Sequence, residues 1–161
     1  MLLIRKAIEA DRDGIWTIFE QVIARGDSYT FAPDTSRAEA ETFWLSSKVQ
    51  TYVACEGKDI VGSYILRPNQ PGLGSHVANA GYMVRDDQQG NGIGRAMCEH
   101  SLEEARTAGY EAMQFNIVVS TNEAAVALWK KMGFEIVGTL PKAFRHLELG
   151  LVDAYVMYRF L

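Results

Sequence analysis

The sequence predicts one mixed α/β domain over residues 1–161, and three observations support this fold class. The length of 161 residues suits a single domain with a substantial core. Apolar runs of strand length alternate along the chain with segments whose apolar residues repeat at helical spacing. The hydrophobic fraction of 48% and the charged fraction of 22% are those of an ordinary soluble globular protein.

The first half of the chain predicts four strands and two helices. An apolar run forms the first strand, and Asp11 can cap a helix with one apolar face. Ser36 can cap a second helix after an irregular loop at residues 25–36. A pair of strands then meets at a turn, and a loop rich in Pro and Gly precedes the fourth strand. The expected helices are 11–24 and 36–46, and the expected strands are 2–7, 51–55, 60–66 and 76–84.

The second half begins with a glycine loop that opens a helix, which ends before Gly109. A strand follows, and Asn122 can cap the next helix, which ends before Gly133. Two further strands complete the chain, and residues 140–151 between them are expected to form a long connection. The expected helices are 93–108 and 122–131, and the expected strands are 113–119, 134–137 and 154–160.

Composition excludes several function classes. The net charge is −4 and no basic stripe is present, which argues against a nucleic-acid partner. No apolar segment is long enough for a membrane span or a signal peptide. Cys55 and Cys98 match no metal spacing and are expected to be reduced core thiols of a cytoplasmic protein. Apolar residues of the middle and final strands could form a dimer surface, so a homodimer is possible.

The segment from Gln89 to Arg95 has the chemistry of an anion site. Its sequence is Gln89-Gly90-Asn91-Gly92-Ile93-Gly94-Arg95. Glycines permit a tight turn with inward-facing N–H groups, and the helix N-terminus behind them adds free donors and partial positive charge. The loop lacks the Gly-Lys-Ser/Thr ending of P-loop nucleotide hydrolases and the G-x-G-x-x-G spacing of dinucleotide sites. A diphosphate of another kind is therefore expected, the alternative being a glycine turn without a ligand.

Two motifs in order resemble the GNAT superfamily of N-acetyltransferases. Gln89, Gly92 and Gly94 occupy the places of the family's acetyl-CoA motif, Q/R-x-x-G-x-G/A. Farther along, Asn122-x-x-Ala125-x-x-Leu128-Trp129 followed by Gly133-Phe134 is similar to the family's next helix and turn. The resemblance is specific over residues 79–137 and generic in the first third of the chain.

This resemblance implies a twisted, mostly antiparallel sheet of about seven strands with a splayed central pair and about four flanking helices. It implies acetyl-CoA as co-substrate, without a metal. The loop amides would hold the pyrophosphate, and the pantetheine arm would pair with the open strand edge near Met83 and Val84. Asn122 would contact the cofactor as well as cap its helix. The expected cofactor-binding residues are Met83, Val84, Gln89, Gly90, Asn91, Gly92, Ile93, Gly94, Arg95, Asn122, Ala125 and Trp129.

The chain departs from the family at two catalytic positions. Asn79 stands where many relatives have a Glu base, and an amide cannot accept a proton at neutral pH. Trp129 stands where relatives usually have a Tyr acid, and its indole N–H is not a useful acid. Proton transfer is therefore expected through water or through Tyr82, His76 or His146. The residues expected to take part in catalysis are Asn79, Tyr82 and Asn116.

The acceptor side is expected to come from strands and loops. Asn116 lies in an apolar strand and needs a hydrogen-bond partner, which is either backbone across the splayed strands or the substrate. The asparagine pattern, with Trp129, looks like the subgroup containing fungal acetyltransferases of proline analogues, which implies a small amino-acid-like amine. The expected substrate-binding residues are Tyr29, Phe31, Asn79, Asn116 and Arg145.

The leading function is therefore acetyl-CoA-dependent N-acetylation of a small amine by direct attack in a ternary complex. No cysteine is placed for a covalent intermediate. Two alternatives stay open: a protein or peptide N-acetyltransferase, and a non-catalytic acyl-CoA-binding module.

Overall fold

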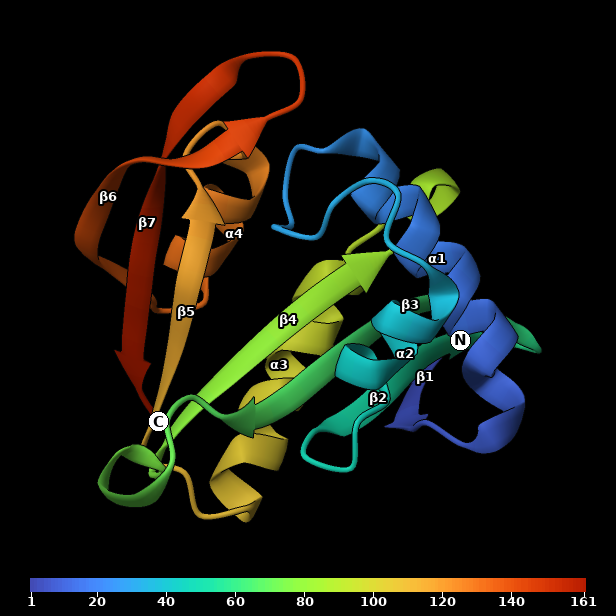
Figure 1. Ribbon diagram of the computed structural model, residues 1–161. Coiled ribbons are helices and arrows are strands. Elements are labelled where there is room, and N and C mark those ends of the chain that lie inside the picture. Colours follow the sequence, from blue (N-terminus) through green and yellow to red (C-terminus); the bar gives the residue numbers. More distant parts are fainter.

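The computed structural model describes residues 1–161 and is built on a seven-stranded sheet of order β1-β2-β3-β4-β5-β7-β6 (Figure 1). The pair β4–β5 is parallel, and all other neighbours are antiparallel. The strands are β1 (Leu2–Lys6), β2 (Gln50–Glu56), β3 (Asp59–Pro68), β4 (Val77–Val84), β5 (Ala112–Val119), β6 (Glu135–His146) and β7 (Gly150–Phe160).

Four α-helices flank this sheet, which confirms the predicted mixed fold. They are α1 (Arg12–Arg25), α2 (Arg37–Trp44), α3 (Ile93–Thr107) and α4 (Glu123–Lys131). Helices α1 and α2 cover one face, and α3 and α4 lie on the other (Figure 1). Short 3-10 turns occur at Glu9–Asp11, Gly72–Gly74 and Asp86–Gln88. None of the helices has the length and hydropathy that a membrane crossing requires.

Helices α1 and α2 begin where the sequence predicted, but only one of the two predicted caps forms. Ser36 caps α2 as expected, because its Oγ accepts from the Glu39 amide while the Glu39 carboxylate accepts from the Ser36 amide. Asp11 precedes α1 but makes no side-chain cap. Its carboxylate instead binds Arg5 and the amide of Ile8, which holds β1 against the start of α1.

Strands β4 and β5 form the splayed pair. They are in register only at Val77↔Ala112 and Ala78↔Met113. Beyond these residues the strands separate toward their carboxyl ends (Figure 1). Strand β5 also has an irregularity between Phe115 and Val118 in its pairing with β7. The sheet therefore has two halves, joined at the base of β4 and β5 and open above it.

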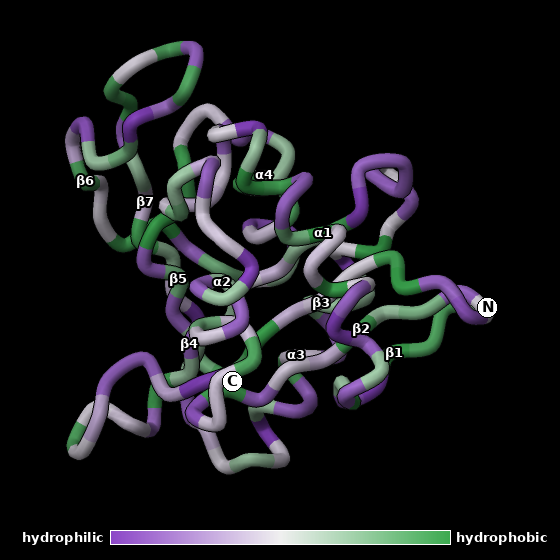
Figure 2. Tube along the Cα trace, turned by 45° about the vertical axis from the view of Figure 1, so that its right-hand side comes forward, coloured by the Kyte–Doolittle hydropathy of each residue, from purple (hydrophilic) through white to green (hydrophobic).

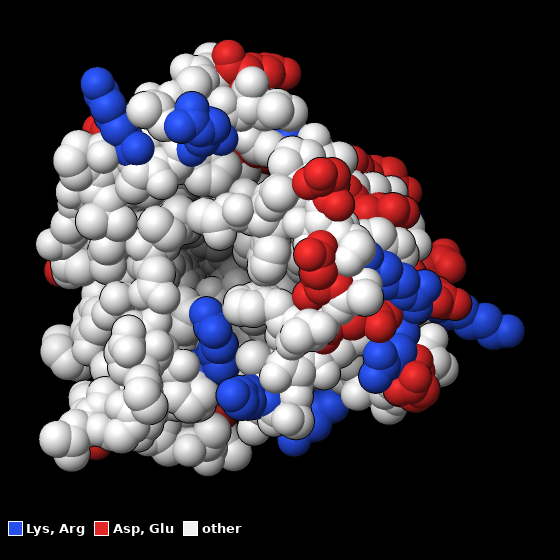
Figure 3. Space-filling model, viewed as in Figure 1, with Lys and Arg blue, Asp and Glu red and all other residues white.

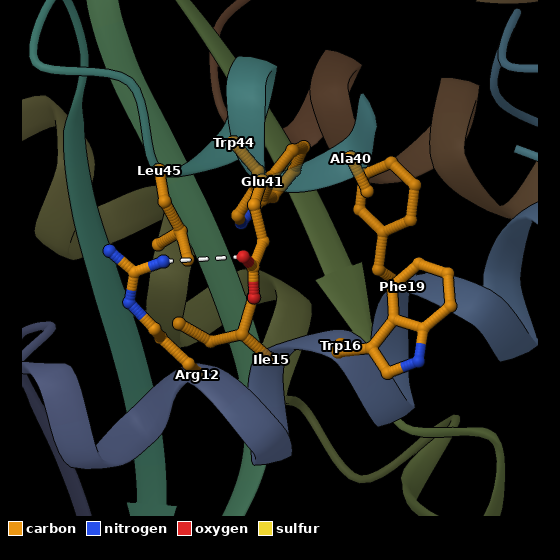
Figure 4. A pocket seen from close by; sticks show the side chains of 8 residues that line it. All are labelled: Arg12, Ile15, Trp16, Phe19, Ala40, Glu41, Trp44 and Leu45. Atoms are coloured by element: carbon orange, nitrogen blue, oxygen red, sulfur yellow. Dashed lines mark hydrogen bonds and ion pairs between the residues drawn. The ribbon is translucent and has the colours of Figure 1, made fainter. Parts of the chain in front are cut away.

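Two apolar clusters bury the two faces of the sheet. Hydrophobic and hydrophilic residues are interleaved along the strands and helices (Figure 2). On the α1/α2 face, Phe19 packs edge-on against Trp44 at 5.7 Å between ring centroids. Figure 4 shows the small void between α1 and α2, spanned by the Arg12–Glu41 ion pair. Its volume of about 10 Å³ holds no more than one water molecule, so this void is a packing defect and not a ligand site.

Ser63 joins the sheet to α2 through two buried hydrogen bonds. Its Oγ accepts from Trp44 Nε1 at 3.0 Å and donates to Tyr52 O at 2.8 Å. We expect Ser63→Ala to lower the free energy of unfolding by about 1–3 kcal/mol, because the buried indole N–H loses its partner. Urea denaturation measures this. The control Ser75→Ala removes an exposed hydroxyl that donates to Gly72 O, and an equal loss there would contradict the explanation.

The prediction of a long connection at residues 140–151 is wrong, because β6 continues to His146 and β7 begins at Gly150. The two strands form a hairpin with register shifts on both sides of residues 138–140. Pro141 and Lys142, which has a φ of 52°, break the alternation that would have identified a strand. The hairpin also reaches across the molecule, where the Leu147 amide donates to Gly26 O at the end of α1 over 3.0 Å.

Candidate active site

The splay of β4 and β5 opens a cleft of about 710 Å³. This volume is typical of a small-molecule or cofactor site. Figure 3 shows the hollow in the middle of one face, with charged side chains gathered mainly over the α1/α2 side of the molecule. The cleft is lined by the loop after α1, by β4 and β5, by the glycine loop and by α4.

The edge of β4 that faces β5 carries backbone groups not used by β3. The Arg85 amide donates to Val61 O, and the Asn69 amide donates to Val77 O. In an antiparallel ladder every second pair of opposite residues is hydrogen-bonded, so the Ser63–Met83 pair is bonded through its backbone groups. The backbone N–H and C=O groups of Tyr82 and Val84 point the other way, toward β5. Above Ala78 no residue of β5 is in register to receive them.

Met83 lines the cleft, as expected of a cofactor-binding residue, but its backbone does not belong to the open edge. Met83 was expected at the open edge, but its backbone faces β3 and its side chain is buried against α1. The edge groups are those of Tyr82 and Val84, one residue to either side. Two side chains already use the carbonyls of this edge: Tyr29 Oη donates to Tyr82 O at 2.8 Å, and Gln89 Nε2 donates to Val84 O at 3.0 Å.

The glycine loop has the backbone conformation that its sequence suggested. Gly90 and Gly92 both have a φ of 79°, in the left-handed region that glycine adopts without strain. Gly92 is also the residue before α3, so the free amides of the first helical turn face the loop. Gln89, Gly90, Gly92, Ile93, Gly94 and Arg95 line the cleft, whereas Asn91 turns its amide to Gln88 Oε1.

Helix α4 supplies the opposite wall. Asn122 Oδ1 accepts from the Ala125 amide at 3.3 Å, which is the expected cap. Ala125, Leu128 and Trp129 line the cleft with it. Trp129 packs on Phe115 and Tyr82 at centroid distances of 4.9 and 5.1 Å, so its ring is part of the wall between β4 and β5.

The asparagines of β4 and β5 form a polar network at the base of the cleft. Asn79 Nδ2 donates across the splay to Gln114 O at 2.9 Å. Asn116 accepts from Gln114 Nε2 at 2.9 Å and donates to Asn69 Oδ1 at 2.8 Å. Asn116 therefore has side-chain partners rather than the backbone partner weighed from sequence. Both Asn79 and Asn116 line the cleft as expected.

Several residues that line the cleft were not expected from sequence, and Arg67 is the one among them with a charged side chain and no ion pair. It lies opposite Asn79 in the β3–β4 register, and its Nε donates to Asn79 Oδ1 at 3.3 Å. Its guanidinium lies over the Phe43 ring, 4.9 Å from the centroid. Arg145, expected to meet a substrate carboxylate, lies on the hairpin strand β6 and does not line the cleft.

Tyr29 and Phe31 lie where they were expected, in the wall of the cleft. Their rings stack at 6.2 Å, and Phe31 meets Phe43 edge-on at 5.2 Å. Gly81 makes room for the Tyr29 hydroxyl, because a Cβ at Gly81 would lie 3.0 Å from Tyr29 Oη. Burial raises the pKa of Tyr29 above its usual value, so the hydroxyl stays protonated.

The other expected proton carriers are poorly placed. The Tyr82 hydroxyl binds Ser101 Oγ at 2.6 Å on the α3 side of the sheet, and burial raises its pKa well above the usual value. His76 precedes β4 and does not line the cleft. His146 Nδ1 accepts from the amides of Glu148 and Leu149 at the hairpin turn. The geometry argues against all three as proton carriers.

The cleft contains positive but no negative side chains. Its lining includes Arg25, Arg67 and Arg95, and no Asp, Glu, His or Lys. Arg25 pairs with Asp27 and Asp86, and Arg95 pairs with Glu99. Arg67 makes no ion pair within the protein. An anion entering the cleft would therefore find one cation without a carboxylate partner.

Comparison with known proteins identifies the family. The model of the acetyltransferase (GNAT) family matches residues 16–134. The chain belongs to the GNAT family. The family match extends the two sequence motifs back into α1, and the seven-stranded sheet with four helices agrees with the solved GNAT structures. The protein is accordingly an N-acetyltransferase by class.

Several GNAT relatives and structures are similar along most of the chain. N-acetyltransferase aca1 of Schizosaccharomyces pombe is 29% identical, over 83% of this chain and 72% of its own. The L-methionine sulfoximine/L-methionine sulfone acetyltransferase of Pseudomonas aeruginosa is 28% identical, over 86% of this chain and 83% of its own. The L-amino acid N-acetyltransferase AaaT of Escherichia coli is 33% identical, over 69% of this chain and 68% of its own.

Among solved structures, a GCN5-related N-acetyltransferase from Kribbella flavida has a TM-score of 0.95 and 38% identity, covering 99% of this chain and 98% of its own. A Salmonella typhimurium acetyltransferase, yncA, solved with its cofactor acetyl-CoA, has a TM-score of 0.87 at 20% identity, covering 100% of this chain and 94% of its own. At 20% identity, the similarity to yncA shows a shared fold and nothing more.

Proposed function

We propose that this GNAT enzyme transfers the acetyl group of acetyl-CoA to the amine of a small amino acid or analogue, by direct attack in a ternary complex. One observation carries the proposal. The open edge of β4 lies in a single cleft between a glycine anion loop and an arginine without a carboxylate partner. Donor and acceptor would meet at that edge, near Tyr82.

The residues present fit coenzyme A. The amides around Gly90 and Gly92 would hold its pyrophosphate, and the backbone edge of Tyr82 and Val84 would pair with its pantetheine arm. Gly94 has no side chain to occupy the cleft at this point, and its nearest side-chain neighbours are Leu128 and Val84, 3.7 and 3.9 Å from where a Cβ would lie. When bound, the cofactor supplies an acetyl thioester, whose carbonyl the backbone N–H groups of this edge would polarise.

The acceptor end fits a small molecule with a carboxylate. Arg67 is held from two sides, by stacking on Phe43 and by its bond to Asn79, so its remaining N–H groups are available to an anion. The aromatic wall of Tyr29, Phe31 and Phe43 suits the carbon skeleton of such a ligand. The names of the P. aeruginosa and E. coli relatives point to the same amino-acid class.

The acceptor amine must reach the thioester as the free base, and no Asp, Glu or His lines the cleft to deprotonate it. Tyr29 and Tyr82 stay protonated in the assay range because burial raises the pKa of each. We expect kcat/KM to rise about tenfold per pH unit until the pH passes the acceptor's own amine pKa.

Assays with acceptors whose amines differ in pKa test this pH dependence. The inflection should move with the acceptor, because the titrating group is the acceptor amine and not a side chain. An inflection at one fixed pH for every acceptor would reveal a protein base and contradict the expectation.

The proposed reaction is tested by thiol release from acetyl-CoA over a panel of amines. The panel comprises L-methionine sulfoximine, L-methionine sulfone, L-phenylalanine, a proline analogue, spermidine and a short peptide. We expect the amino acids to react and spermidine, which lacks a carboxylate, to react least. If only the peptide reacts, the protein is a peptide N-acetyltransferase. If acetyl-CoA binds and no amine reacts, it is a non-catalytic acyl-CoA-binding module.

Two further properties stay predictions. A cytoplasmic location fits the two free, buried cysteines, Cys55 and Cys98. A homodimer fits the exposed apolar residues of the β6–β7 hairpin, among them Val137, Leu149 and Leu151.

A further inference from the structure

One phenol hydroxyl lies at the open edge of β4. Tyr29 Oη is 2.8 Å from Tyr82 O, a carbonyl directed into the gap between β4 and β5. Gly81 leaves the space that this hydroxyl fills, since a Cβ there would approach it to 3.0 Å. The ring is fixed by Trp44 at 6.1 Å and by Phe31 at 6.2 Å. The position of the hydroxyl is therefore determined by packing on two sides and by a hydrogen bond at its tip.

Acetyl transfer from a thioester needs a donor for the sulfur that departs. Trp129 cannot serve, because an indole N–H donates a hydrogen bond but does not release its proton. The Tyr82 hydroxyl is occupied by Ser101 on the α3 side. The remaining hydroxyls in the lining are those of Ser28, Thr30 and Tyr29. A phenol is a much stronger acid than an aliphatic alcohol, which leaves Tyr29.

We propose that Tyr29 is a catalytic residue that donates its proton to the departing thiolate of coenzyme A. This proposal rests on the function proposed above. The acceptor nitrogen forms a bond to the thioester carbonyl carbon, the carbon–sulfur bond breaks, and its electron pair stays on sulfur. Sulfur takes the Tyr29 proton, and the proton lost by the acceptor nitrogen returns through water to the tyrosine oxygen.

The present partner of Tyr29 explains how its hydrogen is released for this step. Tyr82 O holds the hydroxyl in the absence of ligand. The same carbonyl lies on the edge with which the pantetheine arm would pair. Once the arm occupies that carbonyl, the Tyr29 hydrogen is free to turn toward the sulfur.

The first test compares Tyr29→Phe with Tyr64→Phe. Tyr29→Phe keeps the ring and the wall but removes the hydroxyl, so we expect kcat to fall about 100-fold. Acetyl-CoA affinity, measured by calorimetry, should stay unchanged. The control Tyr64→Phe removes a hydroxyl that binds His100 Nδ1 on the α3 side, away from the cleft, and should retain kcat. An unchanged kcat in Tyr29→Phe overturns the proposal.

The second test needs no turnover. The thiol of free coenzyme A is titrated on the protein by its ultraviolet thiolate absorbance. A donor to the thiolate lowers the pKa of that thiol, so we expect it to rise by about one to two units in Tyr29→Phe. Equal thiol pKa values in the two proteins overturn the proposal. If the wild-type protein acetylates no amine, the proposed function fails, while this titration still shows whether the Tyr29 hydroxyl reaches the coenzyme A sulfur.

Discussion

Gly94→Glu is expected to weaken acetyl-CoA binding about 100-fold. Gly94 lies in the first turn of α3, beside the left-handed Gly92 and in the lining of the cleft. A carboxylate there faces the pyrophosphate and cancels the partial positive charge of the helix start. Two like charges near 4 Å at an effective dielectric constant of about 20 repel by about 4 kcal/mol. Screening by salt in the open cleft lowers this to about 3 kcal/mol, which is about two orders of magnitude in affinity. Calorimetry with acetyl-CoA measures the loss.

The matched control is Gly94→Ala. The glycine has an ordinary helical conformation, and a Cβ would make normal contacts with Leu128 and Val84. The alanine variant should therefore bind acetyl-CoA nearly as well as wild type. A second control, Gly94→Gln, adds the bulk of glutamate without its charge, so its comparison with Gly94→Glu separates repulsion from steric intrusion. Equal affinities for the glutamate variant and wild type would show that the pyrophosphate does not bind at this loop.

Arg67→Ala is expected to raise KM for amino-acid acceptors about 10- to 100-fold, with acetyl-CoA affinity unchanged. A hydrogen bond to a charged group contributes about 1.5–3 kcal/mol, and Arg67 is the cleft arginine without a carboxylate partner in the protein. Steady-state kinetics with L-methionine sulfone and with its carboxamide measure the effect. The KM for the carboxamide should change little in Arg67→Ala, because this acceptor has no carboxylate for Arg67 to bind.

Arg145→Ala is the control for this variant. Arg145 is an arginine outside the cleft and outside every ion pair of the protein. Its removal changes the net charge by the same amount, so long-range attraction of an anionic substrate affects both variants equally. A KM increase as large in Arg145→Ala as in Arg67→Ala would mean that Arg67 makes no specific contact.

The conformation of the glycine loop and the cap of α4 were predictable because their signals are local. Gly90 and Gly92 take up their conformation within one turn, and Asn122 caps the helix that begins at the next residue. Each of these residues acts on close neighbours in sequence, so spacing alone carries the information. The resemblance to a family then supplied the fold, including the splayed pair.

The acceptor end was less predictable because it depends on contacts between distant segments. Arg67 meets Asn79 only through the β3–β4 register and meets Phe43 only through the packing of α2. Met83 was assigned to the open edge because a strand's two edges cannot be distinguished until its register is known. Arg145 was chosen for its position in an expected loop, which the structure resolves as a hairpin strand.

The open edge of β4 also bears on how such an enzyme changes its substrate during evolution. The groups that would bind the donor at Tyr82 and Val84 are peptide N–H and C=O groups, which every non-proline residue possesses. Substitutions at Arg67, Asn79 or Asn116 alter the acceptor surface without removing those groups. In the proposed site, donor binding would depend on the path of the main chain and acceptor choice on exchangeable side chains, so the acceptor could change in evolution while acetyl-CoA use is retained.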